Sequence, residues 1–134
     1  MVSAKVMENF HLEATPKTPG LNFNSQNGNF EISGRSIPEN SIDFYKPLLD
    51  WLDAYLKKPL QLTHLTIKLE YFNTSSSKCL VDIFRRLEKL HSSGNDVQVE
   101  WFYEEEDEDM QESGEDFKEI IKLPIKLVLI NSEE

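Results

Sequence analysis

The sequence predicts a single α/β domain in which a five-stranded mixed sheet packs against three main helices. Apolar residues alternate in 60–72, 97–103 and 124–130, as they do in strands, and recur at helical spacing in the segments between them. A strand followed by a helix and a further strand has a parallel neighbour, whereas the two short strands expected before the first helix form an antiparallel hairpin. Because one chain has both arrangements, the sheet is expected to be mixed.

The opening hairpin is expected over residues 21–34. LNFN and NFEISG alternate between apolar and polar residues, and Asn27-Gly28 between them suits a tight turn because both residues tolerate positive φ. The preceding residues 1–17 are mixed and polar and end in TPKTP, which is typical of a loosely ordered N-terminal tail. The folded domain is therefore expected to span residues 18–134.

The first helix is expected from Ser41 to Lys57, because its apolar residues recur at intervals of three and four. The IPENS segment precedes it, and Pro38 and Glu39 followed by Ser41 are typical of the start of a helix. Pro59 ends the helix, since proline lacks a backbone N–H and clashes with the preceding turn.

A long strand, LQLTHLTIKLEYF (60–72), follows. Alternation places Leu65, Ile67, Leu69 and Tyr71 on one face. The residues expected to supply much of the core are Leu65, Ile67, Leu69, Leu80, Ile83, Phe84, Leu87, Val97, Val99 and Trp101.

The second helix is expected from about Thr74 to His91, with Gly94 closing it. The strand VQVEWFY (97–103) comes next, and the acidic segment 104–121 has a weaker helical pattern. PIKLVLI supplies the last strand, so the order of elements is β-β-α-β-α-β-α-β.

Charge and composition exclude several classes of partner. The 134 residues carry a formal net charge of −10, which argues against nucleic acid or an anionic membrane surface, since either needs a basic patch. No run approaches the ~18 apolar residues of a membrane span, and the first residues lack the apolar core of a signal peptide. A single cysteine, Cys79, excludes an internal disulfide framework and fits a reducing compartment. We expect a cytoplasmic protein.

Four consecutive hydroxyl residues, from Thr74 to Ser77, stand where the long strand gives way to the second helix. One interpretation is structural: Thr74 or Ser75 is the N-cap, its oxygen accepting a backbone N–H. The other is that Thr74 is a phosphoacceptor, because the free N–H groups and partial positive charge of a helix N-terminus tolerate a phosphate. The two interpretations are compatible.

Other chemistry-bearing residues do not form an enzyme site. The acidic run from Glu104 to Asp109 could bind Ca²⁺ or Mg²⁺, but it lacks the spacing of a calcium loop, and a solvated helix start is favoured. The three histidines lack metal-ligand spacing, and Cys79 lies on a helical stripe as a packed thiol. We expect no enzyme, no metal site and no cofactor.

Three stretches resemble the SiaC family of bacterial regulatory phosphoproteins: ISGRSIPENSIDFYKPLLDWLDAYL, LEYFNTSSSKCLVDIFRRLEKL and WFYEEEDEDMQESGEDF. The resemblance covers about residues 17–130 in order, and the PENS and NTSS elements are its specific motifs. The family is similar in fold and in switching logic to the STAS-domain anti-sigma-factor antagonists, so a STAS-like fold is implied.

The resemblance implies a partner-switching role. A serine/threonine protein kinase would phosphorylate the threonine of the NTSS element, which is Thr74, and a PP2C-type phosphatase would remove the phosphate. The unphosphorylated form would bind an effector such as a diguanylate cyclase, linking the switch to cyclic di-GMP and biofilm control. Ser75 is a possible secondary acceptor.

The effector is expected to dock around Thr74, because helix N-termini cluster at the carboxyl edge of a βαβ sheet. The residues expected to bind it are Asn73, Ser75 and Ser76 with Pro38, Glu39, Asn40 and Ser41 of the PENS turn. The alternative for PENS is a helix cap without a partner. The alternative function is a constitutive acidic adaptor, or a divalent-metal-binding module, that uses residues 104–109.

Overall fold

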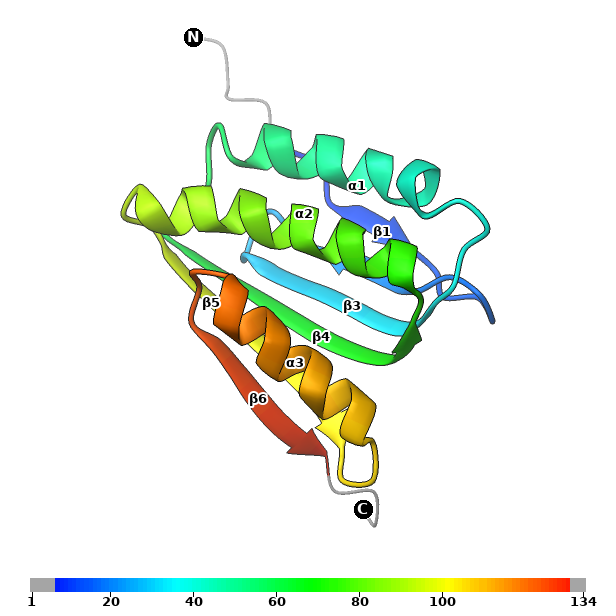
Figure 1. The fold of residues 1–134 in the computed structure, drawn as a ribbon. Coiled ribbons are helices and arrows are strands. Elements are labelled where there is room, and N and C mark those ends of the chain that lie inside the picture. Colours follow the sequence, from blue (N-terminus) through cyan, green and yellow to red (C-terminus); the bar gives the residue numbers. More distant parts are fainter. Residues whose placement is uncertain (1–6, 131–134) are drawn as a thin grey trace, which may run out of the picture.

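Six strands form one mixed sheet, and they lie side by side in the same order as in the sequence (Figure 1). This computed structural model describes residues 7–130. The strands are β1 (Phe10–Leu12), β2 (Gly20–Phe23), β3 (Asn29–Ser36), β4 (Leu62–Phe72), β5 (Asp96–Glu104) and β6 (Ile125–Ile130). The pairs β1–β2 and β2–β3 are antiparallel, and the pairs from β3 to β6 are parallel. The mixed sheet is confirmed.

Three helices cover one face of this sheet (Figure 1). They are α1 (Ser41–Tyr55), α2 (Thr74–Ser92) and α3 (Glu108–Ile120). Each connects two neighbouring parallel strands, and right-handed crossovers in a constant direction place every helix on the same side. Within residues 7–130, no helix combines the length and the apolar character that crossing a bilayer requires.

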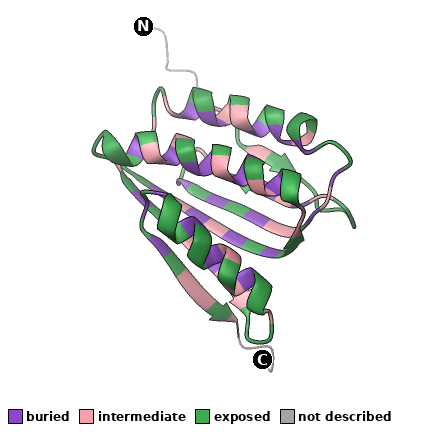
Figure 2. Ribbon diagram, viewed as in Figure 1, coloured by how far each residue is buried: buried purple, intermediate pink, exposed green. Residues whose placement is uncertain are grey.

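The core lies between the helices and the covered face, and the strands alternate between buried and exposed residues (Figure 2). All ten residues predicted for the core are buried, with Trp101 and Leu87 fully enclosed. Gly114 of α3 lets the helix approach Trp101 closely, because a Cβ there would lie 2.5 Å from Trp101 Cδ1. Trp101 Nε1 donates to the Met110 carbonyl at 2.9 Å, which fixes α3 over the sheet.

The sixth strand, β1, is the difference from the predicted five, and it lies within the segment expected to be a loose tail. Three residues are too few for a period of two to stand out in the sequence. Contacts with distant residues hold this segment: Ser25 Oγ donates to the Met7 carbonyl at 2.7 Å, and Trp51 Nε1 donates to the Glu8 carbonyl at 2.8 Å. Residues 1–6 of the expected tail lie outside the described residues.

The turn of the opening hairpin is longer than predicted. Residues 24–28 connect β2 to β3, and the Asn24 side chain accepts from the backbone of Gln26 and Asn27 at 2.8 and 3.1 Å. Only Gly28 has positive φ in this turn, at 78°, so Asn27 does not share that conformation. The side-chain bonds of Asn24 replace the two-residue turn expected from Asn27-Gly28.

An irregularity in the β3–β4 pairing corrects the predicted position of Tyr71. Gly34 pairs with Leu69, but Arg35 pairs with Tyr71, so the register skips one residue of β4. An extra residue reverses the alternation beyond it, because side chains point to opposite faces with a period of two. Tyr71 therefore leaves the face that holds Leu69 and is 51% exposed, and Phe72 packs against Trp101 with ring centroids 5.9 Å apart.

Candidate functional site

Two strand-to-helix junctions meet at the carboxyl edge of the sheet. Ser36 ends β3 and leads into the PENS turn and α1, and Phe72 ends β4 and leads through Asn73 into α2. Ser36 and Phe72 are register partners, so both helices begin at the same edge. Ser41 Oγ lies 2.7 Å from Ser75 Oγ, which places the PENS turn directly beside the start of α2.

Asparagine side chains cap both helices. Asn73 is the N-cap of α2, and its Oδ1 accepts from the backbone N–H of Ser76 at 2.8 Å. Asn40 caps α1 in the same way, accepting from Asp43 N at 3.1 Å. The expectation that Thr74 or Ser75 caps α2 is therefore wrong. Asparagine is among the strongest capping residues, and here it stands one position earlier, which makes Thr74 the first helical residue.

A chain of buried hydroxyl groups runs behind these caps. Ser36 Oγ lies 2.6 Å from Tyr45 Oη and donates to Ser76 Oγ at 2.7 Å. Ser76 Oγ in turn donates to the Ser36 carbonyl at 3.0 Å and lies 3.3 Å from Ser41 Oγ. Side chains of β3, α1 and α2 thus share one hydrogen-bonded cluster. Within the described residues, every buried side-chain N or O atom has a partner.

The predicted site residues divide into a surface group and a supporting group. Thr74, Ser75, Glu39 and Asn40 are exposed, and Asn73 is partly exposed. Ser76 and Ser41 are buried, with exposed fractions of 0% and 3%, and Pro38 is also buried. We expected all of them to contact a partner, but the structure encloses the side chains of Ser76, Ser41 and Pro38 beneath the surface.

The Thr74 hydroxyl differs from its neighbours. It forms no hydrogen bond with the part of the chain that the structure describes, whereas Ser75 Oγ donates to Asn73 Oδ1 at 3.2 Å and contacts Ser41. Ser76 is fully enclosed. Ser77 Oγ also has no hydrogen bond within the described residues, but Ser77 is half-buried, so of the four hydroxyl residues only Thr74 is both exposed and unbonded there.

The sequence did not reveal four residues of this edge: Ser36, Tyr45, Ile42 and Tyr71. Ser36 and Tyr45 supply the inner end of the hydroxyl chain, and no sequence pattern marks a serine that ends a strand as buried. Ile42 is 73% exposed in the first turn of α1, and its place outside the apolar stripe was a readable signal. Tyr71 is exposed through the register irregularity, which alternation alone does not predict.

Burial changes the acid–base properties of two side chains behind the site. Burial raises the pKa of Tyr45 to about 12, and the nearby Cys79 adds to the rise, while the bond to Ser36 opposes it. Burial also raises the pKa of the Cys79 thiol, with a further contribution from Asp82. A raised thiol pKa leaves little thiolate at neutral pH, in agreement with a packed cysteine.

The acidic run forms the turn between β5 and α3. Asp107 is the N-cap of α3 and accepts from Met110 N at 3.0 Å, and Glu108 and Asp109 lie in the first helical turn. Acidic side chains at this position are stabilised by the helix dipole. Within residues 7–130, no group of three or more His, Cys, Asp or Glu side chains is arranged to hold a metal ion.

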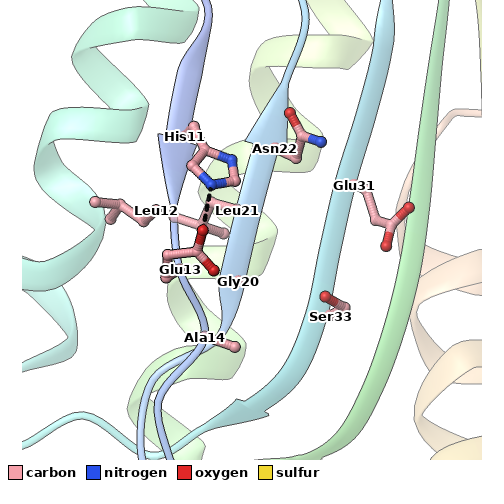
Figure 3. A pocket seen from close by; sticks show the side chains of 9 residues that line it. All are labelled: His11, Leu12, Glu13, Ala14, Gly20, Leu21, Asn22, Glu31 and Ser33. Atoms are coloured by element: carbon pink, nitrogen blue, oxygen red, sulfur yellow. Dashed lines mark hydrogen bonds and ion pairs between the residues drawn. The ribbon is translucent and has the colours of Figure 1, made fainter.

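A hollow of about 220 Å³ lies away from these junctions, over β1, β2 and β3 (Figure 3). His11 Nε2 and Glu13 Oε1 form a pair 3.1 Å apart on one side, and Glu31 and Ser33 stand on β3 at the other. None of the predicted site residues lines it. The residues predicted to act together instead meet at the carboxyl edge.

Comparison with known proteins identifies the family. The profile described as "SiaC family regulatory phosphoprotein" matches residues 12–130. A protein of Pseudomonas aeruginosa strain UCBPP-PA14 is 32% identical over 121 residues, which cover 90% of this chain and 96% of that protein.

Solved structures agree. SiaC of Pseudomonas aeruginosa superposes with a TM-score of 0.85 at 31% identity, covering 92% of this chain and 100% of that one. The same score and identity hold for a crystal structure of the diguanylate cyclase SiaD in complex with its activator SiaC from that organism, covering 90% of this chain and 99% of that one. The sequence match, the shared fold and the confirmed α/β architecture lead to one conclusion: the chain belongs to the SiaC family of regulatory phosphoproteins.

Proposed function

We propose that this protein is a non-enzymatic partner-switching protein whose unphosphorylated form binds and regulates a diguanylate cyclase. A serine/threonine kinase adds a phosphate to Thr74 and thereby ends the interaction, and a PP2C-type phosphatase restores it. The observation that carries the proposal is the Thr74 hydroxyl at the junction of two helix N-termini, which is exposed and has no hydrogen bond to any of residues 7–130.

The neighbouring hydroxyls support this choice of acceptor. A kinase must bring its substrate oxygen to the γ-phosphate of ATP, so the oxygen must be accessible. Ser76 is fully buried, and Ser75 Oγ is engaged with Ser41 and Asn73. Phosphorylation of Thr74 breaks none of these bonds, so the fold tolerates both states.

The surface around Thr74 has the composition of a docking site. Ile42 is 73% exposed and Tyr71 is 51% exposed, and both lie at the ends of elements that meet at the carboxyl edge. Exposed apolar side chains bordered by polar groups are typical of protein interaction surfaces. Glu39 and Asn40 add polar contacts beside them.

Electrostatics explains how a phosphate would end the interaction. A phosphothreonine adds about −1.5 to −2 charges at pH 7. The chain already carries a formal net charge of −10, and Glu39 and Asp43 are exposed at the start of α1. A dianion placed in a surface that had packed against a partner must lose its hydration, which opposes binding by several kcal/mol when it finds no cation there.

A diguanylate cyclase is the effector that the comparisons support, because SiaC of Pseudomonas aeruginosa forms a complex with the cyclase SiaD as its activator. Through such an enzyme the switch would act on cyclic di-GMP and biofilm formation. The protein itself supplies binding, and the chemistry belongs to its partners.

The test is a titration of four forms against SiaD and against the diguanylate cyclases of the chain's own organism: wild type, Thr74→Ala, Thr74→Glu and protein carrying phosphothreonine at position 74. We expect wild type and Thr74→Ala to bind equally and the phosphothreonine form to bind at least 100-fold more weakly, a loss of about 2.7 kcal/mol or more. Thr74→Glu should weaken binding less, because a carboxylate carries about half the charge of a phosphate.

Gln98→Glu is the matched control, because it adds one negative charge at an exposed position of β5 without touching the Thr74 junction. It should bind like wild type. Equal affinities of the four forms would overturn the proposal. Stabilisation by Ca²⁺ that is indifferent to changes at Thr74 would instead favour the acidic module based on residues 104–109.

A further inference from the structure

The buried hydroxyl chain has a defined direction of hydrogen bonding. Each serine hydroxyl has one proton to donate. Ser76 directs its proton to the Ser36 carbonyl at 3.0 Å, and Ser36 directs its own to Ser76 Oγ at 2.7 Å. The remaining contact of Ser36 Oγ, 2.6 Å to Tyr45 Oη, can then form only if the tyrosine donates. Three side chains therefore fix one another's orientation.

The outer end of the chain reaches the surface. Ser75 Oγ donates to Asn73 Oδ1 at 3.2 Å, so the short contact between Ser41 Oγ and Ser75 Oγ, at 2.7 Å, uses the proton of Ser41. Ser41 Oγ also lies 3.3 Å from Ser76 Oγ. The protons of both serines are already used, so this contact is not a hydrogen bond. Asn73 Oδ1 links the two parts instead, because it accepts from Ser76 N at 2.8 Å and from Ser75 Oγ, the residue next to Thr74.

The hydroxyl chain joins the end of one strand to the starts of two helices. Ser36 ends β3, Ser41 begins α1, and Ser76 lies in the first turn of α2. The Ser36 carbonyl also accepts from Asn73 N at 3.0 Å, so Ser36 holds the backbone of the second junction as well. These bonds therefore hold Glu39 and Asn40 on one loop at a defined spacing from Thr74 and Ser75 on the other.

We propose that Ser36, Ser76 and Tyr45 are positioning residues of the Thr74 site, which join the two helix N-termini into one recognition surface. The proposal rests on the proposed function, in which a partner contacts both loops at once. A partner that binds two loops loses affinity when they move independently, because it must then order them on binding.

The opposite edge of the sheet supplies a matched control. Tyr55 Oη lies 2.8 Å from Thr63 Oγ1, and both side chains are buried. This pair has the same chemistry as the Tyr45–Ser36 contact and the same helix, α1, but it lies where β4 begins. Tyr55→Phe therefore removes an equivalent hydroxyl group far from Thr74.

The experiment compares wild type with Ser76→Ala, Tyr45→Phe and Tyr55→Phe by cyclase titration, by thermal melting and by amide ¹H–¹⁵N NMR spectra. Ser76→Ala removes two buried hydrogen bonds of its side chain and Tyr45→Phe removes one, and each variant should weaken cyclase binding about threefold to tenfold. Tyr55→Phe should lower the melting temperature by a similar amount yet bind within twofold of wild type.

The spectra test the positioning without any partner. Ser76→Ala and Tyr45→Phe should shift the amide resonances of Asn40, Ser41 and Thr74 together, and Tyr55→Phe should leave them in place. Equal loss of affinity in all three variants, or unchanged affinity in Ser76→Ala, would overturn the proposal.

The two proposals fail in different ways. If wild type binds none of the cyclases, the proposed effector is wrong and the spectra alone decide on the positioning role. Shifts confined to the neighbours of each substituted residue would then reject it, and joint shifts of both loops would support it.

Discussion

The two ends of α1 are attached to the sheet by the same kind of residue in different ways. At the carboxyl edge, Tyr45 donates into a chain that reaches Ser76, and the Ser36–Ser76 bond spans 40 positions of the sequence. At the amino edge, Tyr55 bonds to Thr63, eight positions away. The first arrangement links three elements, and the second closes a local connection between a helix and the strand that follows it.

Their surroundings differ as well. Tyr55 is packed among aromatic rings, with centroids 5.6 Å from Trp51 and 5.0 Å from Phe30. The ring of Tyr45 packs against Phe44 with centroids 5.0 Å apart, and its hydroxyl contacts Ser36. Apolar packing tolerates small adjustments, but a satisfied buried polar network accepts only one arrangement. Directional hydrogen bonds thus fix the edge of the sheet that carries the candidate site, and aromatic packing predominates at the other edge.

The largest expected effect that separates the two ends is a response to alkaline pH. Burial raises the pKa of Tyr45 from 10.0 to about 12. The unfolded chain releases this proton near pH 10 and the folded protein keeps it, so stability is complete below pH 10 and falls as the pH rises to about 12. The loss amounts to about 2 to 3 kcal/mol.

Denaturant unfolding of wild type and Tyr45→Phe between pH 8 and 12 measures this effect. The free energy of unfolding should fall less steeply in Tyr45→Phe, because the group that titrates is gone. Parallel curves for the two proteins would show that the hydroxyl of Tyr45 is not held in the protonated form by the fold.

The next effect concerns the outer end of the hydroxyl chain and compares how much the adjacent residues Asn73 and Thr74 contribute to stability. Asn73→Ala should lower the free energy of unfolding by about 1 kcal/mol, because it removes the cap of α2. Thr74→Ala should change it by less than about 0.5 kcal/mol, since Thr74 follows the cap and alanine favours helices. Urea unfolding of both variants checks this order, and a larger loss in Thr74→Ala would restore threonine as the cap.

The smallest expected effect is the coupling free energy between residues of the hydroxyl chain. Tyr45 and Ser76 are joined through Ser36, so a double-mutant cycle of Tyr45→Phe with Ser76→Ala should give a coupling free energy of about 0.5 to 1 kcal/mol. The cycle of Tyr55→Phe with Ser76→Ala should be additive, because these residues lie at opposite edges. If both cycles were additive, the hydrogen bonds of the hydroxyl chain would act independently of one another.

Much of the fold could be predicted because it depends on periodic burial. The alternation that places Leu65 and Ile67 in the core, and the helical stripe that contains Ile83 and Leu87, leave signals in every turn or pair of residues. The strand β1 leaves none, since its place depends on bonds from Ser25 and Trp51, which lie far away in the sequence.

The site was partly predictable for the same reason. Thr74 and the PENS turn could be placed together because parallel strands with crossover helices bring helix starts to one edge. The roles of Ser36 and Ser76 could not, because a buried serine and an exposed serine have the same chemistry until a partner across 40 positions is known. Tyr71 was misplaced because a single skipped residue reverses the faces of a strand.

The strand order has a consequence for the kind of ligand that this edge can receive. In doubly wound α/β sheets the direction of winding reverses once, the loops on either side diverge, and small ligands bind in the crevice between them. Here the sheet from β3 to β6 advances in one direction, and the Ser41–Ser75 and Ser36–Ser76 bonds close the space between the first two loops. From β3 to β6 the sheet thus lacks such a topological switch point, and the proposed function assigns this edge to a protein partner instead of a small ligand.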